Sequence, residues 1–228
     1  MDDFVCVNKD VIVFNKPAGM PSHALKKGEG DTALDRVVAH YPEVALASLD
    51  QREGGLVHRL DNNTSGLLIF ARNLASHTFF RQLIQTSQIE KSYLALVQGR
   101  IPGTMVFNLP IAHHAKNKSK MIVVKEETRF FRGQPKPATT FVEPIAWGEE
   151  ATLIRVEIRG GRRHQIRIHL ADAGHPLLGD ELYGGPEAAY LPGHALHADS
   201  LVLPDGLKLI APVPELFKKE AAKYGIGF

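Results

Sequence analysis

The sequence has a single cysteine among 228 residues, which excludes an internal disulfide framework and any zinc site built on cysteines. The apolar neighbours of this residue, Cys6, predict a buried structural thiol. The chain also lacks an apolar run near the ~20 residues of a membrane span. Its acidic start has none of the positive charge of a signal peptide. These absences predict a cytoplasmic protein without a membrane partner.

An excess of charge of either sign is absent as well. The formal net charge of +2 is too small to identify a nucleic-acid binder, so such binding would need basic residues gathered on one face. The composition, 44% hydrophobic and 23% charged, is that of an ordinary globular protein with enough residues for a full core. No repeat, linker or low-complexity segment interrupts it, and we expect one domain over residues 1–228.

The signatures of several enzyme classes are missing. None of the motifs HExxH, GxSxG, GxGxxG or the Walker loop occurs, and HRLD lacks the aspartate directly after arginine that a kinase needs. The eleven histidines are not spaced as metal ligands, since His113 and His114 are adjacent while His164 and His169 are five apart. We therefore expect neither a metal nor a cofactor, and we interpret the histidines as polar core residues or as residues that support the side chains of a site.

The hydrophobic pattern predicts an α+β fold with a mixed, largely antiparallel sheet, flanking helices and a central active-site cleft. Asp31 or Thr32 is expected to cap a first helix and Asn73 a second. The second helix should turn a face that includes Phe79 and Phe80 toward the core. A terminal helix is expected over 214–224, and strands over 4–7, 11–14, 67–71, 91–97, 139–146, 152–158, 197–203 and 207–210.

The densest polar chemistry lies in the stretch GGLVHRLDNNTSGLLIFARN, residues 54–73. After Asp61 come residues that bond their own backbone or adopt unusual dihedrals, and then an apolar run that predicts a buried strand. The loop should therefore be rigid and should aim the Asp61 carboxylate. The alternative is that Asp61 only caps a turn and pairs with Arg59 on a solvated surface.

A second polar cluster, residues 159–174, predicts a glycine loop that opens a helix. An isolated carboxylate without a cofactor can act as a nucleophile or stabiliser at a glycosidic carbon, provided that it is ionised and well aimed. Arg167, at the start of this helix, is a suitable partner for Asp61, and Ile166 beside it offers an apolar wall. Between Lys116 and Lys136 basic residues outnumber acidic ones, which fits either a solvated hairpin or a phosphate-contacting arm.

These motifs resemble those of the RluA-type RNA pseudouridine synthases. HRLDNNTSGLL resembles the family signature, in which HRLD is followed by two variable residues and TSGLL. Asparagine at positions 62 and 63, where charged residues are common in relatives, leaves specificity open. The other blocks that resemble the family pattern are Lys16-Pro17-Ala18-Gly19 with His23, Lys91-Ser92-Tyr93-Leu94-Ala95, residues 161–170, residues 174–180, Tyr183-Gly184 and Leu196-His197-Ala198.

The resemblance implies the isomerisation of uridine to pseudouridine inside an RNA, with base flipping and without a cofactor. Asp61 would act at the ribose, either by attack on the anomeric carbon or by removal of the neighbouring proton. Tyr93 would stack on the uracil and take the proton from carbon 5. Arg167 would pair with Asp61.

Four further residues would bind the RNA. Arg59 would hold the phosphate of the flipped nucleotide or fill the space that it leaves. Ile166 would line the base pocket, while Lys16 and Arg163, with the segment 116–136, would contact the RNA backbone.

The implied partner is a stem-loop of ribosomal or transfer RNA, and we expect a monomer. Several relatives carry a small N-terminal RNA-binding domain, which we do not expect in this chain. Two rival functions stay open: a catalytically idle module that binds and remodels RNA, and a base-excising glycosidase that uses Asp61 with water. The glycosidase lacks an evident carboxylate pair.

Overall fold

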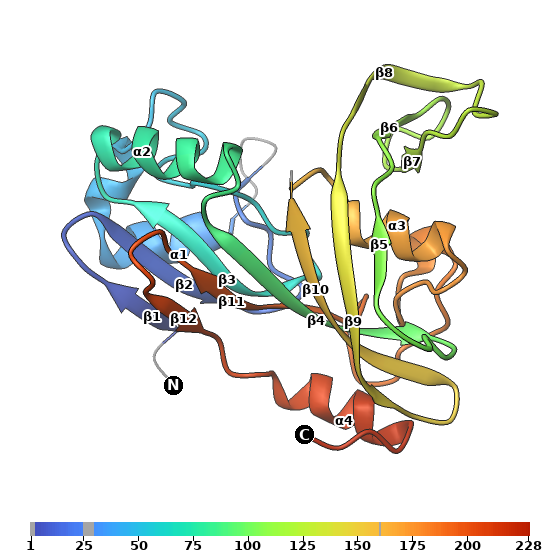
Figure 1. Ribbon diagram of the computed structural model, residues 1–228. Helices are drawn as coiled ribbons and strands as arrows, with labels where there is room; N and C mark the ends of the chain where they lie inside the picture. The colour runs from blue at the N-terminus through green and yellow to red at the C-terminus, as the bar shows by residue number, and fades with distance from the viewer. Residues whose placement is uncertain (1–2, 25–29, 160) are drawn as a thin grey trace. The chain divides into compact units, whose positions relative to one another are not determined.

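The computed structural model describes residues 3–24, 30–159 and 161–228, which divide into two compact units (Figure 1). The first unit contains the chain up to Lys91 together with His197–Pro212, and the second contains Ser92–Leu196 and Val213–Phe228. Each unit is thus built from two separate stretches of the chain. Gly160, in the predicted glycine loop, lies outside the described residues.

The first unit holds a mixed sheet. Its strands are β1 (Phe4–Val7), β2 (Val11–Lys16), β3 (Ser65–Ala71), β11 (Leu196–Val202) and β12 (Lys208–Ile210), and its helices are α1 (Ala33–His40), the short 3-10 helix η1 (Pro42–Leu46) and α2 (Leu74–Gln85). The strands pair in the order β1, β2, β3, β11, β12. Only β3 and β11 run parallel, while the other neighbours are antiparallel.

Helix α2 packs on one face of this sheet. Phe80 and Leu83 join a core cluster with Val13 of β2 and Ile69 of β3. Phe79 is 55% exposed, so the prediction that it faces the core is wrong. Phe80 and Leu83 lie three residues apart on one face of the helix and form the buried stripe, whereas Phe79 points about 100° away from Phe80 and off this stripe.

The helix caps of the first unit follow the prediction. The Thr32 side chain accepts a hydrogen bond from the backbone amide of Asp35, and the Asp35 carboxylate accepts one from the backbone amide of Thr32. Asn73 caps α2 by accepting a hydrogen bond of 2.9 Å from the amide of Ser76. Polar side chains of these types satisfy amides that have no partner inside the helix.

The second unit holds two sheets. The larger consists of β4 (Glu90–Gln98), β10 (Ala151–Arg159), β9 (Thr139–Trp147) and β5 (Met105–Phe107), in that order and antiparallel throughout. The smaller consists of β7 (Met121–Val123), β6 (Ile111–His114) and β8 (Phe131–Lys136), and in Figure 1 β8 leads directly into β9. The helices are α3 (Gln165–Asp172), the 3-10 turn η2 (Glu181–Tyr183) and α4 (Glu215–Lys223).

Each helix of the second unit is fixed to the larger sheet by a different kind of contact. Phe217 of α4 packs with Leu94 and Leu153 in an apolar cluster. On α3, the His169 ring forms a buried hydrogen bond of 2.8 Å with the Thr140 hydroxyl of β9. Helix α3, which carries Arg167, is therefore held against the sheet.

The predicted α+β class is confirmed, as is the mixed, largely antiparallel sheet. The sequence did not predict the short strands β5 to β8. Strands β5, β6 and β7 have only three or four residues, and β8 (FRGQPK) contains glycine, proline and charged residues that weaken the strand pattern. Cys6 is half-buried rather than fully buried. Within the described ranges, no helix is both long enough and apolar enough to cross a membrane.

Candidate active site

The loop that carries Asp61 is pinned to the first unit at both ends. On the side that precedes Asp61, the amide of Val57 donates to the carbonyl of Ile69 at 3.0 Å, and the chain pairs there with β3. On the other side, the amide of Thr64 donates to the carbonyl of Asp61 itself at 3.0 Å, which closes a tight turn. Asp61, the first residue of this turn, is half-buried, and Arg59 is exposed.

A second loop, residues 17–22, braces the Asp61 loop. The Ser22 hydroxyl, buried, donates to the carbonyl of Leu60 at 2.9 Å and accepts from the Leu60 amide at 3.1 Å. The amide of Gly19 donates to the carbonyl of Asn62 at 2.9 Å. The residues on either side of Asp61 are thus both bonded to the same neighbouring loop.

Lys16 completes this brace. Its side chain is fully buried, and its ammonium donates to the carbonyl oxygens of Pro17 at 2.9 Å, Met20 at 2.7 Å and Asn62 at 2.9 Å. An ammonium has three hydrogens, so these three carbonyls use all of them. The contact of Lys16 with the RNA backbone stays a prediction; in the structure the ammonium binds the loop carbonyls that converge on it.

The charge of Asp61 acts on Lys16. Burial lowers the pKa of Lys16 to about 7, and the negative charge of Asp61 works in the opposite direction. The two groups therefore stabilise each other's ionised form. A carboxylate that is to act at an electron-poor carbon must be ionised, and Lys16 is a cation of the same unit that favours this state.

Gly66 fixes the point where the Asp61 loop enters β3. Its φ of +109° is a conformation that residues with a side chain rarely adopt. A Cβ atom at this position would also collide with the carbonyl of Ala198 in β11, which lies opposite Gly66 in the parallel pair. One residue earlier, the Ser65 hydroxyl forms a buried hydrogen bond of 2.9 Å with Nδ1 of His197.

The start of α3 is the corresponding fixed point of the second unit. His164 precedes the helix with a φ of +55°, which is uncommon for a residue with a side chain. The Gln165 carboxamide accepts from the Arg162 amide at 2.9 Å and donates to the carbonyl of Thr139 at 2.8 Å. These bonds hold the turn before α3 in one conformation and so fix the backbone positions of Ile166 and Arg167.

Arg167 forms a buried ion pair with Asp180. The pair is bidentate, with Nε 2.7 Å from one carboxylate oxygen and one terminal nitrogen 2.8 Å from the other. The guanidinium carbon also lies 5.1 Å from the centre of the Tyr183 ring. The Tyr183 hydroxyl in turn accepts from the amide of Met121 and bonds His164, each at 2.8 Å. Arg167 is therefore held rigidly.

The structure places the remaining predicted residues on β4 and around the start of α3. Tyr93 and Ile166 are buried, with 7% and 4% exposure, on β4 and in the first turn of α3. Arg163 is exposed and reaches the carbonyl of Ser119 at 3.3 Å, next to the small sheet. Asp61, Arg59 and Lys16 belong to the first unit, and Tyr93, Arg163, Ile166 and Arg167 to the second. The pairing of Arg167 with Asp61 stays a prediction.

The basic segment between Lys116 and Lys136 forms the small sheet and its loops. Six of its seven basic side chains are exposed, and Lys120 is half-buried over the Tyr183 ring. Phe130, between Arg129 and Phe131, is 79% exposed. Many RNA-binding surfaces combine exposed basic side chains with an exposed aromatic ring.

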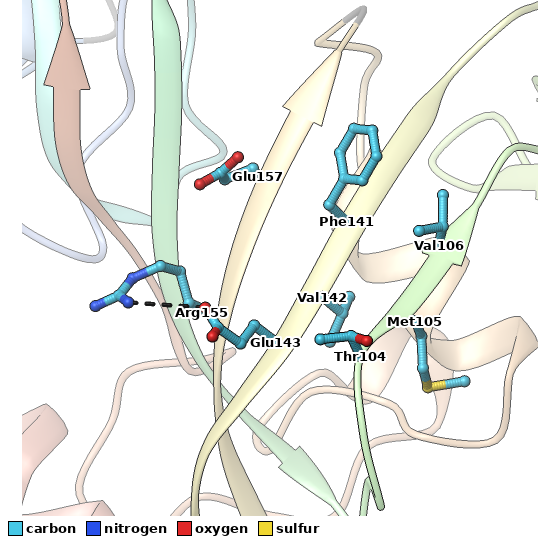
Figure 2. Close-up of a pocket in the computed structure, with 8 residues that line it drawn as sticks. All are labelled: Thr104, Met105, Val106, Phe141, Val142, Glu143, Arg155 and Glu157. Carbon is cyan, nitrogen blue, oxygen red and sulfur yellow. Dashed lines mark ion pairs between the residues drawn. The ribbon is translucent and has the colours of Figure 1, made fainter.

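A pocket of about 230 Å³ lies elsewhere in the second unit, on β5, β9 and β10 (Figure 2). Its charged rim includes Arg155 and Glu143, 3.9 Å apart, and Glu157. The full lining is Thr104, Met105, Val106, Phe141, Val142, Glu143, Arg155 and Glu157. None of the residues predicted from the sequence lines this pocket, and it plays no part in the candidate site.

Sequence reasoning missed two functional partners. Asp180 was noticed only as part of a motif, although it is the buried counter-ion of Arg167. Ser22 carried no signal at all, because serine in a loop is ordinary. A buried carboxylate thirteen residues from an arginine is visible only once the fold brings the two together.

The described residues match a known family. The sequence model of the RNA pseudouridylate synthase family matches residues 10–172. Among the relatives is the ribosomal large subunit pseudouridine synthase D of Yersinia pestis, 32% identical over 80% of this chain and 53% of that protein. The protein of the same name from Vibrio parahaemolyticus is 31% identical over 98% of this chain and 73% of its own length. The chain thus spans about half the length of the first relative.

The fold has solved counterparts. The structure of human RNA Pseudouridylate Synthase Domain Containing 4 has a TM-score of 0.77, with 23% sequence identity, over 99% of this chain and 94% of that chain. At this identity the likeness concerns the fold alone.

Proposed function

The chain belongs to the RNA pseudouridylate synthase family, and from this premise we propose that it isomerises uridine to pseudouridine in structured RNA. The observation that carries the proposal is the Asp61 loop, which lies inside the matched residues and is braced by Lys16, Gly19 and Ser22. A carboxylate held in this way has the fixed position that attack at a ribose carbon requires.

The reaction breaks the bond between N1 of uracil and the anomeric carbon, turns the base, and joins carbon 5 to the same ribose carbon. Atoms balance because carbon 5 loses one proton and N1 gains one. Asp61 acts at the ribose, by attack on the anomeric carbon or by removal of the neighbouring proton. Tyr93 stacks on the free uracil and takes the carbon 5 proton. No cofactor is consumed.

Arg167 and Ile166 support these steps from the start of α3. Arg167 is expected to pair with Asp61 while its other contacts, to Asp180 and the Tyr183 ring, keep its guanidinium in place. Ile166 supplies an apolar wall to the base pocket.

The RNA is bound by cations outside the reaction centre. Arg59, exposed beside the Asp61 loop, holds the flipped nucleotide or fills the space that it leaves. Arg163 and the exposed basic residues of the small sheet contact the backbone. The names of the relatives favour large-subunit ribosomal RNA as the substrate over transfer RNA. We further propose that residues 1–228 act as one catalytic domain, as a monomer and in the cytoplasm.

The test is pseudouridine mapping at nucleotide resolution. Purified protein is incubated with large-subunit ribosomal RNA transcripts, and total RNA is compared between cells with and without the gene. A site that appears with the wild type and not with Asp61→Asn supports the proposal. Asp205→Asn, in the exposed turn before β12, is the matched control and should leave turnover unchanged.

RNA affinity separates the proposal from its rival. Asp61→Asn should keep its affinity for RNA within about threefold, because the change removes a charge from the reaction and not from the binding surface. RNA binding by the wild type without any pseudouridine on these RNAs would favour the idle RNA-remodelling module.

A further inference from the structure

The first unit buries two lysines whose ammonium groups meet different surroundings. Lys16 reaches three carbonyl oxygens. Lys91, the second residue of β4, is 8% exposed, yet within the described part of the chain its ammonium has no hydrogen bond and no ion pair. A largely buried charge without a partner is costly, and the ammonium nitrogen of Lys91 retains some exposure to solvent, through which an anion could reach it. The position of Lys91 therefore suits a negatively charged partner from outside the protein.

The electrostatic surroundings of Lys91 also favour an anion. Burial lowers the pKa of Lys91 to about 8, so the side chain keeps its proton at neutral pH. The neighbouring titratable group is His58, whose pKa falls to about 3 through burial and, to a smaller extent, through the charge of Lys91. The neutral ring of His58 accepts a hydrogen bond of 3.3 Å from the Ile69 amide. Lys91 is thus a single positive charge beside a neutral imidazole.

We infer that Lys91 is an anion-binding position that receives one backbone phosphate of the substrate RNA. This inference rests on the proposed function, which supplies the polyanion. Each nucleotide brings one negative charge, and a lysine ammonium binds phosphate as a compact point charge with three donors. Inorganic phosphate has the same chemistry, and the experiment below distinguishes the two sources.

The position of Lys91 in its strand indicates which phosphate it receives. Lys91 and Tyr93 are two residues apart in β4, so their side chains point to the same side of the strand. Two steps along a strand cover ~7 Å, which is about the reach of one nucleotide. The phosphate on Lys91 therefore belongs to the nucleotide whose base meets Tyr93 or to its direct neighbour.

The salt dependence of RNA binding tests the contact. Dissociation constants are measured for the wild type, Lys91→Met and Lys91→Arg between 50 and 300 mM salt, with thermal melts to verify folding. Methionine keeps the unbranched stem and removes the charge, so we expect about tenfold weaker binding and a salt slope lower by about one. Lys91→Arg should retain the slope. Lys208→Met, an exposed lysine of β12, should change neither quantity.

A direct measurement keeps the inference testable if Lys91→Met fails to fold. In wild-type protein with ¹³C-labelled lysine, the Lys91 pKa is measured alone, with an RNA stem-loop and with inorganic phosphate. A pKa that rises with the RNA supports the contact, because an adjacent phosphate favours the charged ammonium. An unchanged pKa with RNA, together with an unchanged salt slope in Lys91→Met, overturns it. A rise with inorganic phosphate but not with RNA also overturns it and identifies a site for a free anion.

The outcome is separable from that of the proposed function. If the RNA raises the Lys91 pKa while no uridine is converted, the phosphate contact stands and the isomerase proposal fails. If uridines are converted while Lys91→Met keeps the wild-type affinity and slope, only the phosphate contact fails.

Discussion

The ammonium of Lys16 donates a hydrogen bond of 2.9 Å to the carbonyl oxygen of Asn62, the residue that follows Asp61. The same ammonium binds the carbonyls of Pro17 and Met20, so one buried donor joins two loops. The position of the carboxylate proposed to act at the ribose thus depends on a lysine that takes no part in the chemistry.

Replacement of this lysine should impair turnover more than binding. Lys16→Met leaves three carbonyls without their donor, which should lower the free energy of unfolding by about 2 kcal/mol. A loosened Asp61 loop should reduce kcat about 100-fold, while the affinity for RNA changes less than threefold. Single-turnover kinetics and binding titrations measure both, with Lys9→Met in an exposed turn as the control. Equal losses of kcat and affinity would mean that Lys16 contacts the RNA after all.

The titration of Lys16 predicts how stability depends on pH. Its pKa is about 7 in the folded protein and near 10.5 in the unfolded chain, so between these values the unfolded state binds more protons. The free energy of unfolding should therefore rise with pH from about 7 to 10.5, and Lys91 should add to the rise above pH 8. Thermal melts of the wild type and Lys16→Met measure this rise, and Lys16→Met should reduce it.

Asp61 should also affect the pKa of Lys16. Its charge raises the Lys16 pKa against the effect of burial, so Asp61→Asn should lower the pKa of Lys16 further. NMR of ¹³C-labelled lysine measures this pKa in both proteins. Identical values in the two proteins would show that the carboxylate and the ammonium do not interact.

Features that depend on neighbours in the sequence could be predicted. Thr32 and Asn73 have the side chains that cap helices, and both do so. The apolar run after Gly66 predicted β3, in which every residue is buried. The Asp61 loop was also recognised, because its residue types favour turns and the motif around them is specific.

Features that depend on distant parts of the chain could not be predicted. A lysine is normally solvated, and only the folded loops bring three carbonyls to Lys16. Asp180 becomes the partner of Arg167 through the turn after α3, which has no local signature of an ion pair. Phe79 and Phe80 are chemically equal, and tertiary packing alone decides which one is buried.

The ion pair of Arg167 and Asp180 should contribute strongly to stability. Both side chains are at least nine-tenths buried, so Asp180→Asn leaves a buried guanidinium without its full counter-charge. We expect the free energy of unfolding to fall by about 3–5 kcal/mol. The control is Glu215→Gln, which breaks the exposed pair of Glu215 with Lys218 and should leave the melting temperature unchanged. A small effect of Asp180→Asn would mean that Arg167 is held by its other contacts.

The conformation of Gly66 should be indispensable to the Asp61 loop. In Gly66→Ala the new methyl group meets the backbone of Ala198, and the φ of +109° is itself unfavourable for alanine. Because backbone cannot move aside as a side chain can, β3 and β11 must separate locally, at a cost of about 4 kcal/mol or more.

Gly206→Ala is the matched control for this change. Gly206 also has a positive φ, of +85°, but no atom lies within 4 Å of the Cβ position, so its replacement should cost only about 1 kcal/mol. Urea unfolding measures both variants, and hydrogen exchange at Ser65 and Ala198 locates the damage. If Gly66→Ala were no less stable than Gly206→Ala, the close approach of β3 to β11 would not be what requires glycine. A folded but inactive Gly66→Ala protein would instead show that this contact sets the position of Asp61.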